Sequence, residues 1–138
     1  MSFILQKDGR KFLAELLAGS SSRINGMYVE YGTGAAGKRD LEYFANLKSG
    51  GTSGYARIAV SNAYVDPDCT VHFNGLLCKE DLPVDTPAGV VLNCATLACL
   101  DSDKPEKDRL ICTVDFTCPV MISDGAYTAI HTSMKIGG

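Results

Sequence analysis

The stretch RLICTVDFTCPVMIS (109–123) decides the class of fold. In its middle part, CTVDFTC (112–118), apolar side chains alternate with polar ones. The apolar positions are Cys112, Val114, Phe116 and Cys118. A period of two places successive side chains on opposite faces of a β-strand, so we expect a strand with one face in the core and Thr113, Asp115 and Thr117 on the polar face.

Similar segments follow one another from Gly54 onward. YARIAV (55–60) alternates, and AGVVLNCATLACL (88–100) is apolar on both faces, as a central strand is. Asn74-Gly75 lies between two apolar arms and predicts a hairpin turn, and Asp124-Gly125 predicts a second one. Short strands at this spacing predict a mainly β fold, specifically a β-sandwich or jelly-roll-like domain.

The chain starts with a different pattern, KDGRKFLAELLAGSSS (7–22). It predicts an amphipathic helix over residues 8–18, with Asp8 as its cap and Gly19 as its stop. The helix has one apolar stripe, formed by Phe12, Leu13, Leu16 and Leu17. This stripe can cover the sheet or dock onto another subunit. We favour docking, because the serines at 20–22 allow the helix to leave its own domain.

A second short helix is predicted from Leu41 to Lys48, with Asp40 as its cap. The expected organisation is an N-terminal helical segment (1–22) followed by one β-rich unit (23–138).

The segment EYGTGAAGKRD (30–40) contains a glycine motif. Gly32, Gly34 and Gly37 spell G-x-G-x-x-G, and residues 32–38 also approximate a P-loop. However, Arg39 stands where a P-loop needs Ser or Thr, and the predicted helix is too short for a dinucleotide fold. We therefore interpret the motif as a connection between a strand and a capped helix.

Composition restricts the function. The chain has 138 residues and a formal net charge of −3, which fits one domain and argues against a nucleic-acid surface. Neither a signal peptide nor a membrane-spanning stretch is visible, so we expect synthesis in the cytoplasm and no membrane partner.

Six cysteines and two histidines show no metal-ligand spacing. We expect reduced, mostly buried thiols that fill the core, and we place His72 and His131 on the polar faces of strands. Asp66 and Asp68, beside Pro67, are interpreted as turn formers, with a cation contact as the alternative. No catalytic, cofactor-binding or metal residue is predicted.

Two stretches carry a resemblance, FLAELLAGSSSRINGMYVEY (12–31) and FTCPVMISDGAYTAIHTSMKIGG (116–138). A leading helix, then INGMYVEY, then a β domain closed by a hairpin resembles the small virion proteins of tailed bacteriophages. The resemblance implies a non-enzymatic head decoration, cement, neck, collar or tail-adaptor subunit located in the virion. It also implies other virion proteins as partners and a homo-oligomer, with a trimer or a lattice-ordered monomer as the expected forms.

Two alternatives belong to other classes. One is a small-ligand or glycan-binding β-sandwich. The chain has no Trp and its Tyr residues are scattered, which argues against this alternative. The other is a nucleotide-dependent enzyme that uses the glycine motif at residues 32–38.

Overall fold

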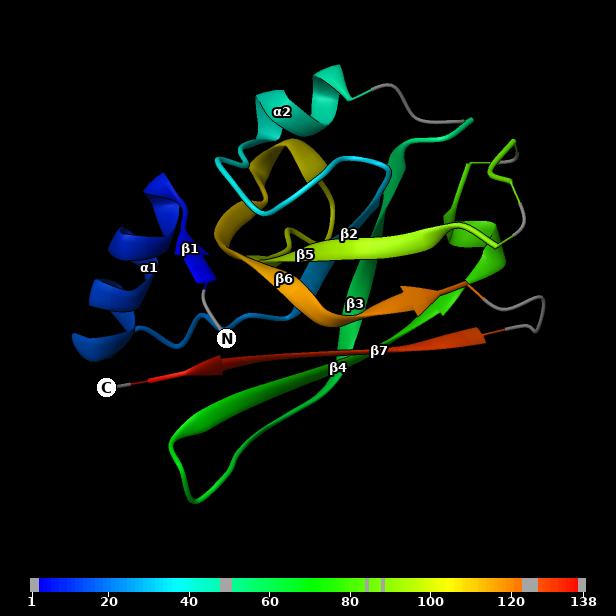
Figure 1. Cartoon of the computed structure of the whole chain (residues 1–138). Coiled ribbons are helices and arrows are strands. Elements are labelled where there is room, and N and C mark those ends of the chain that lie inside the picture. The colour runs from blue at the N-terminus through cyan, green and yellow to red at the C-terminus, as the bar shows by residue number, and fades with distance from the viewer. Residues whose placement is uncertain (1–2, 48–50, 84, 88, 123–126, 137–138) are drawn as a thin grey trace.

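The structure is a computed structural model that describes residues 3–47, 51–83, 85–87, 89–122 and 127–136, without the side chains of residues 3 and 117–119. It contains a seven-stranded antiparallel sheet in the order β1-β6-β5-β2-β3-β4-β7 (Figure 1). The elements are β1 (Phe3–Leu5), α1 (Lys7–Leu17), β2 (Gly26–Tyr31), α2 (Leu41–Asn46), β3 (Gly54–Val65), β4 (Thr70–Cys78), the 3-10 helix η1 (Lys79–Asp81), β5 (Val91–Cys99), the 3-10 helix η2 (Pro105–Lys107), β6 (Arg109–Met121) and β7 (Tyr127–Lys135).

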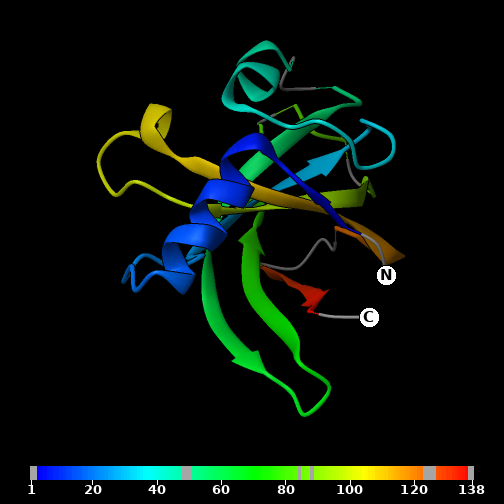
Figure 2. The same cartoon turned by 90° about the vertical axis from the view of Figure 1, so that its left-hand side faces the viewer.

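The sheet curls strongly because β3 belongs to both of its halves. Residues 54–59 of β3 pair with β2, and its later residues pair with β4 after a register shift between Val60 and Asn62. The hairpin of β3 and β4 therefore turns away from β2, β5 and β6 (Figure 2). The prediction of a mainly β fold with two helices is confirmed. A β-sandwich or jelly roll is not confirmed, since the described strands form one sheet.

The main core lies between the two halves of the curled sheet. Its buried side chains come from every strand except β1, and examples are Met27, Ile58, Phe73, Leu97, Val114 and Ile130. Cys112 is fully buried there, which confirms its predicted use as a core side chain. The side chain of Cys118 lies outside the described residues.

The polar face of β6 is covered by other parts of the chain. Thr113 is buried, and its hydroxyl lies 2.8 Å from Gln6 Nε2 and 2.8 Å from Thr96 Oγ1. Asp115 accepts a hydrogen bond from the Ala36 N–H. The period-two pattern thus identified the strand correctly, but the N-terminal segment and the loop after β2 cover its polar face.

The predicted hairpin turn at Asn74-Gly75 is wrong, because both residues lie inside β4. A Cβ at Gly75 would approach the Ala59 carbonyl oxygen to 3.0 Å, so this glycine permits close strand packing. The turn between β3 and β4 instead lies at residues 66–69, where Asp66 Oδ1 accepts the N–H of Asp68. The Asp124-Gly125 prediction falls outside the described residues.

Helix α1 begins one residue earlier than predicted. Its N-cap is Gln6, so Asp8 lies in the first turn and does not cap the helix. Gly19 ends the helix as predicted, with φ of 104° and hydrogen bonds from Gly19 N–H to Leu16 and from Ser20 N–H to Glu15.

Helix α2 begins as predicted, with Asp40 Oδ1 accepting the Tyr43 N–H at 2.7 Å. It ends at Asn46, and Lys48 lies outside the described residues.

Helix α1 packs on β6 of its own sheet (Figure 2). Phe12 is fully buried, Leu13 and Leu16 are half-buried, and Leu17 is 92% exposed. The helix approaches so closely that a Cβ on Gly9 would lie 2.0 Å from the Ile111 carbonyl oxygen. In this structure the stripe therefore covers the sheet through Phe12 and leaves Leu17 at the surface.

Replacing Phe12 with Ala should lower the free energy of unfolding by about 3–5 kcal/mol, the usual cost of truncating a buried phenylalanine. Leu17→Ala should change it by less than about 0.5 kcal/mol, because Leu17 is exposed. Chemical denaturation of both variants measures the difference. Equal stabilities would show that α1 does not pack on its own domain.

Gly9→Ala tests how closely α1 approaches β6. In an exposed helix this change stabilises by about 1 kcal/mol. Here we expect destabilisation, since the new methyl group would overlap the Ile111 backbone. Lys11→Ala, at an exposed position of the same helix, is the control and should leave the melting temperature nearly unchanged. A rise in melting temperature for Gly9→Ala would contradict this packing.

Candidate functional site

The loop that contains the glycine motif (residues 32–40) connects β2 to α2, and Arg39, one of its two basic residues, points inward. Arg39 Nε lies 2.9 Å from Glu30 Oε2, with side-chain exposures of 6% and 0%. The Tyr43 hydroxyl donates to Glu30 Oε1 at 2.8 Å, and the guanidinium of Arg39 lies 4.3 Å from the centroid of the Tyr43 ring. Arg39 is thus neutralised within the fold, whereas Lys38, the other cation of the loop, is exposed.

Hydrogen bonds to the N-terminal segment and to β6 also hold this loop. The Arg39 N–H donates to Gln6 Oε1 at 2.7 Å, and the Ala36 N–H donates to Asp115 Oδ1 at 2.7 Å. A phosphate loop presents free N–H groups to an anion. In this loop two backbone N–H groups already donate to protein oxygens. The loop lies between β2 and α2, so the interpretation of the motif as a strand-to-helix connection is confirmed.

Two neutral groups around Glu30 have raised pKa values, so their neutral forms are favoured further. Burial, together with the neighbouring Glu30 carboxylate, raises the pKa of Tyr43 to about 12. The same two causes raise the pKa of Cys94 to about 12, and its Sγ lies 3.4 Å from Glu30 Oε2. Both groups are therefore neutral at physiological pH. Cys94 is a protonated thiol inside the network.

A second ionic group, with a buried carboxylate and a half-buried arginine, holds the loop between β5 and β6. Asp108 accepts from Arg57 Nε at 2.6 Å, from Arg57 Nη2 at 2.9 Å and from the Tyr28 hydroxyl at 2.5 Å. Burial alone would raise the pKa of Asp108, but the hydrogen bonds from Arg57 and Tyr28 outweigh it and lower that pKa. Like the Glu30 network, this group fixes a loop to the sheet.

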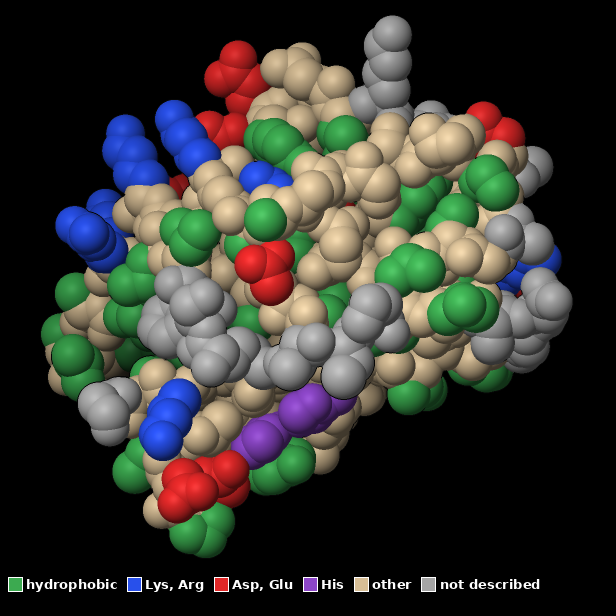
Figure 3. Space-filling view, viewed as in Figure 1, with side chains coloured by type: hydrophobic (Ala, Val, Ile, Leu, Met, Phe, Trp, Pro, Cys, Tyr) green, Lys and Arg blue, Asp and Glu red, His purple; other side chains and the backbone are tan. Residues whose placement is uncertain are grey.

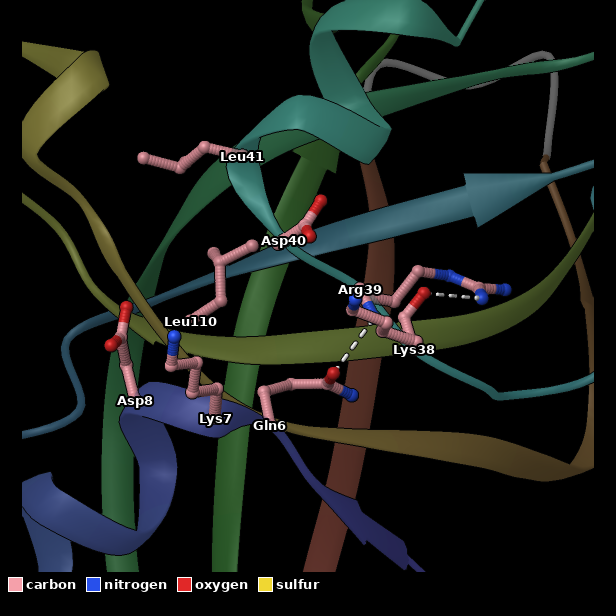
Figure 4. Close-up of a pocket in the computed structure, with 8 residues that line it drawn as sticks. All are labelled: Gln6, Lys7, Asp8, Lys38, Arg39, Asp40, Leu41 and Leu110. Atoms are coloured by element: carbon pink, nitrogen blue, oxygen red, sulfur yellow. Dashed lines mark hydrogen bonds between the residues drawn. The ribbon is translucent and has the colours of Figure 1, made fainter.

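A pocket of about 200 Å³ lies between the start of α1, residues 38–41 and Leu110 (Figure 4). Lys7 and Lys38 line it, but so do Asp8 and Asp40. Charges of both signs in so small a pocket do not select a ligand of one charge.

The two histidines lie together on the sheet. His72 Nδ1, on β4, lies 2.8 Å from His131 Nε2, on β7, and His72 Nε2 lies 2.7 Å from Asp66 Oδ2. Tyr64 stacks on the His72 ring at 4.7 Å between centroids. Both imidazoles are visible at the surface beside acidic side chains (Figure 3).

Sequence reasoning placed each histidine correctly on the polar face of a strand, but it missed their contact. The two residues are 59 positions apart, and only the pairing of β4 with β7 brings them together. The prediction of Asp66 as a turn former is confirmed, and its second carboxylate oxygen contacts His72. The hydrogen bond from His72 lowers the pKa of Asp66, and burial followed by the proximity of His72 lowers that of His131.

The histidines belong to a larger exposed surface, which we call the outer face: Tyr64, His72, Leu76, Tyr127 and His131. The strand register places these side chains on the same side of β3, β4 and β7, away from the core. Three large side chains of this face are at least 47% exposed, namely Tyr64, Leu76 and Tyr127.

The prediction of mostly buried cysteines is wrong for the described ones, because only two of the five are buried. The five described cysteines are free thiols: Cys94 and Cys112 are buried, Cys78 and Cys99 are half-buried, and Cys69 is exposed. Within the described ranges, no group of three or more His, Cys, Asp or Glu side chains is arranged to hold a metal ion. The helices of the described part are also too short and too polar to cross a membrane.

No protein-family model, curated protein or solved structure matches this chain.

Glu30→Gln should lower the free energy of unfolding by about 3–5 kcal/mol, because it leaves the guanidinium of Arg39 buried without a counter-charge. Glu15→Gln is the matched control, since it breaks the surface pair with Arg109 and should have an effect close to the experimental error. Urea denaturation of both variants provides the measurement. Equal losses of stability would mean that Glu30 and Arg39 are not a buried pair.

Proposed function

We propose that this protein is a non-enzymatic structural subunit of a bacteriophage virion that acts through protein–protein contacts. Capsid decoration or cement, and neck or tail accessory subunits, are the roles this proposal includes. The observation that supports it is the outer face, which presents exposed apolar and aromatic side chains on a regular sheet.

The composition of the outer face suits a protein contact. Contiguous exposed apolar side chains are uncommon on monomers and mark interaction surfaces. Tyrosine is enriched in such interfaces, and two of the five outer-face residues are tyrosines. Leu76 lies opposite Ala129 in the β4–β7 pairing, so an apolar area continues from one strand to the next.

The body behind this face suits a rigid building block. Two ionic groups anchor the loops after β2 and β5, and the two halves of the curled sheet pack across one core much as the layers of a sandwich do. Repeated contacts in a symmetric particle need such a fixed surface. The proposal includes assembly as a homo-oligomer, with a trimer as the expected form, and binding to other virion proteins.

The partner surface proposed here differs from the one that the sequence predicted. The N-terminal stripe was the predicted partner surface, but Phe12 is buried against the sheet. Leu17 is the most exposed member of that stripe, but one exposed leucine offers little apolar surface. The outer face offers the larger apolar surface.

One observation favours the small-ligand or glycan-binding alternative. Tyr64, His72 and His131 form a stack of rings at the surface, with centroid separations of 4.7 and 5.1 Å. Exposed rings can pack against a sugar or another flat group. These rings mostly cover one another, so protein contact remains the better-supported use.

The test is to express the tagged protein in cells that produce the phage particles. The particles are then purified, and the co-sedimentation of the tagged protein with them is measured. Leu76→Asp, which puts a charge on the outer face, should abolish co-sedimentation while leaving the melting temperature nearly unchanged. Leu17→Asp is the matched control on α1 and should bind as the wild type does.

Two results would contradict the proposal. Failure of the wild-type protein to enter any particle would exclude a virion role. Loss of binding in Leu17→Asp but not in Leu76→Asp would move the contact from the outer face to α1.

A further inference from the structure

We propose that His72 and His131 form a two-imidazole binding site for a divalent first-row transition metal such as Zn²⁺. The facing ring nitrogens, His72 Nδ1 and His131 Nε2, are 2.8 Å apart, and both side chains reach the surface of the outer face. This site goes beyond the virion role and does not depend on it.

The tautomer of His72 is already suited to metal binding. Its Nε2 lies 2.7 Å from Asp66 Oδ2, and a carboxylate can only accept, so the proton of the neutral ring is on Nε2. The lone pair of Nδ1 therefore points toward His131. A carboxylate behind a histidine is the usual support of a metal-binding imidazole, because it fixes the ring and increases the basicity of the free nitrogen.

His131 must change its tautomer when the metal binds. Since His72 Nδ1 carries a lone pair, we infer that the His131 ring nitrogen 2.8 Å away, Nε2, carries the proton of this contact in the metal-free protein. When the metal binds, the proton moves from Nε2 to Nδ1 of the same ring, and Nε2 becomes a ligand. The ring stays neutral, so this step releases no net proton.

The distance fits after a small adjustment. Two Zn–N bonds of about 2.0–2.1 Å at a tetrahedral angle separate the nitrogens by about 3.3 Å. The rings must therefore move apart by about 0.5 Å relative to the metal-free distance of 2.8 Å, and His131 can rotate because it is exposed. Cross-strand neighbours on a sheet stay close during such a rotation.

The ligand type determines which metals bind. Imidazole suits Zn²⁺, Cu²⁺ and Ni²⁺, whereas Ca²⁺ and Mg²⁺ require oxygen ligands. Two protein ligands leave at least two positions of a tetrahedral ion for water or for a donor from another molecule. The site is therefore an open one, and its affinity depends on both histidines.

Calorimetric titration of ZnCl₂ into the reduced full-length protein tests the site. The wild type should bind one Zn²⁺ per chain through the histidines, and CaCl₂ should give no binding heat. His72→Gln and His131→Gln should each abolish Zn²⁺ binding with little change in melting temperature, because both positions lie outside the core. Zn²⁺ binding that persists in both variants, or its absence in the wild type, would overturn the proposal.

Two neighbouring carboxylates provide a matched pair of variants. Asp66→Asn keeps an oxygen acceptor for the turn but removes the charge behind His72, so it should weaken Zn²⁺ binding by about 10–100-fold. Asp68→Asn changes a carboxylate two positions away and should leave the affinity unchanged. Equal affinities in the two variants would remove the supporting role of Asp66.

The cysteines are the competing ligands and need their own control. The absorption spectrum with Co²⁺ should show no thiolate charge-transfer band in the near ultraviolet. A variant with Cys69→Ser and Cys78→Ser should bind Zn²⁺ as tightly as the wild type does. A strong charge-transfer band, or loss of binding in this variant, would assign the metal to the thiols and overturn the histidine site.

Discussion

The burial of β2 on both of its faces is the constraint on which the rest of the structure depends. Met27 and Val29 enter the main core, and Tyr28 and Glu30 point to the opposite side, where they are buried as well. A carboxylate in that position is costly unless it is paired. Arg39 supplies the charge and Tyr43 supplies a second hydrogen bond, so the loop and α2 must return over the sheet to complete the fold.

The face of the sheet that points away from the core has two parts with different chemistry. On the part covered by α1, the loop and α2, charged groups are buried and paired within the chain, as Glu30 is with Arg39 and Asp108 is with Arg57. On the outer face of β3, β4 and β7, polar and aromatic groups reach the surface instead. His72 and His131 are held by Asp66 and by each other, and no layer of the described chain covers them. The proposed partner contact and the proposed metal site both use this second, uncovered part.

Sequence patterns are ambiguous where one residue type serves two purposes. Asn74-Gly75 has the composition of a hairpin turn, but Gly75 lies within β4 and permits the close approach of β3. The glycine motif at residues 32–37 matches a nucleotide fingerprint, but Gly32 and Gly34 adopt positive φ in a connecting loop. Phe12 belongs to a stripe that fits either a partner or the chain's own sheet, and the two uses have the same periodicity. Local composition does not show which of the two purposes a residue serves, because the residues that it contacts in the fold are distant in sequence.

The sequence by itself determined the mainly β class, the two helices, the Gly19 stop, the Asp40 cap and the burial of Cys112. All of these depend on a backbone preference or a hydrophobic period that acts within a few residues. The tertiary structure alone decided the curl of the sheet at β3, the covering of Thr113, the Glu30–Arg39 pair and the contact of His72 with His131. Each of these depends on strand register or on a loop that returns over the sheet, and residues as far apart as 59 positions become neighbours only when the strands pair.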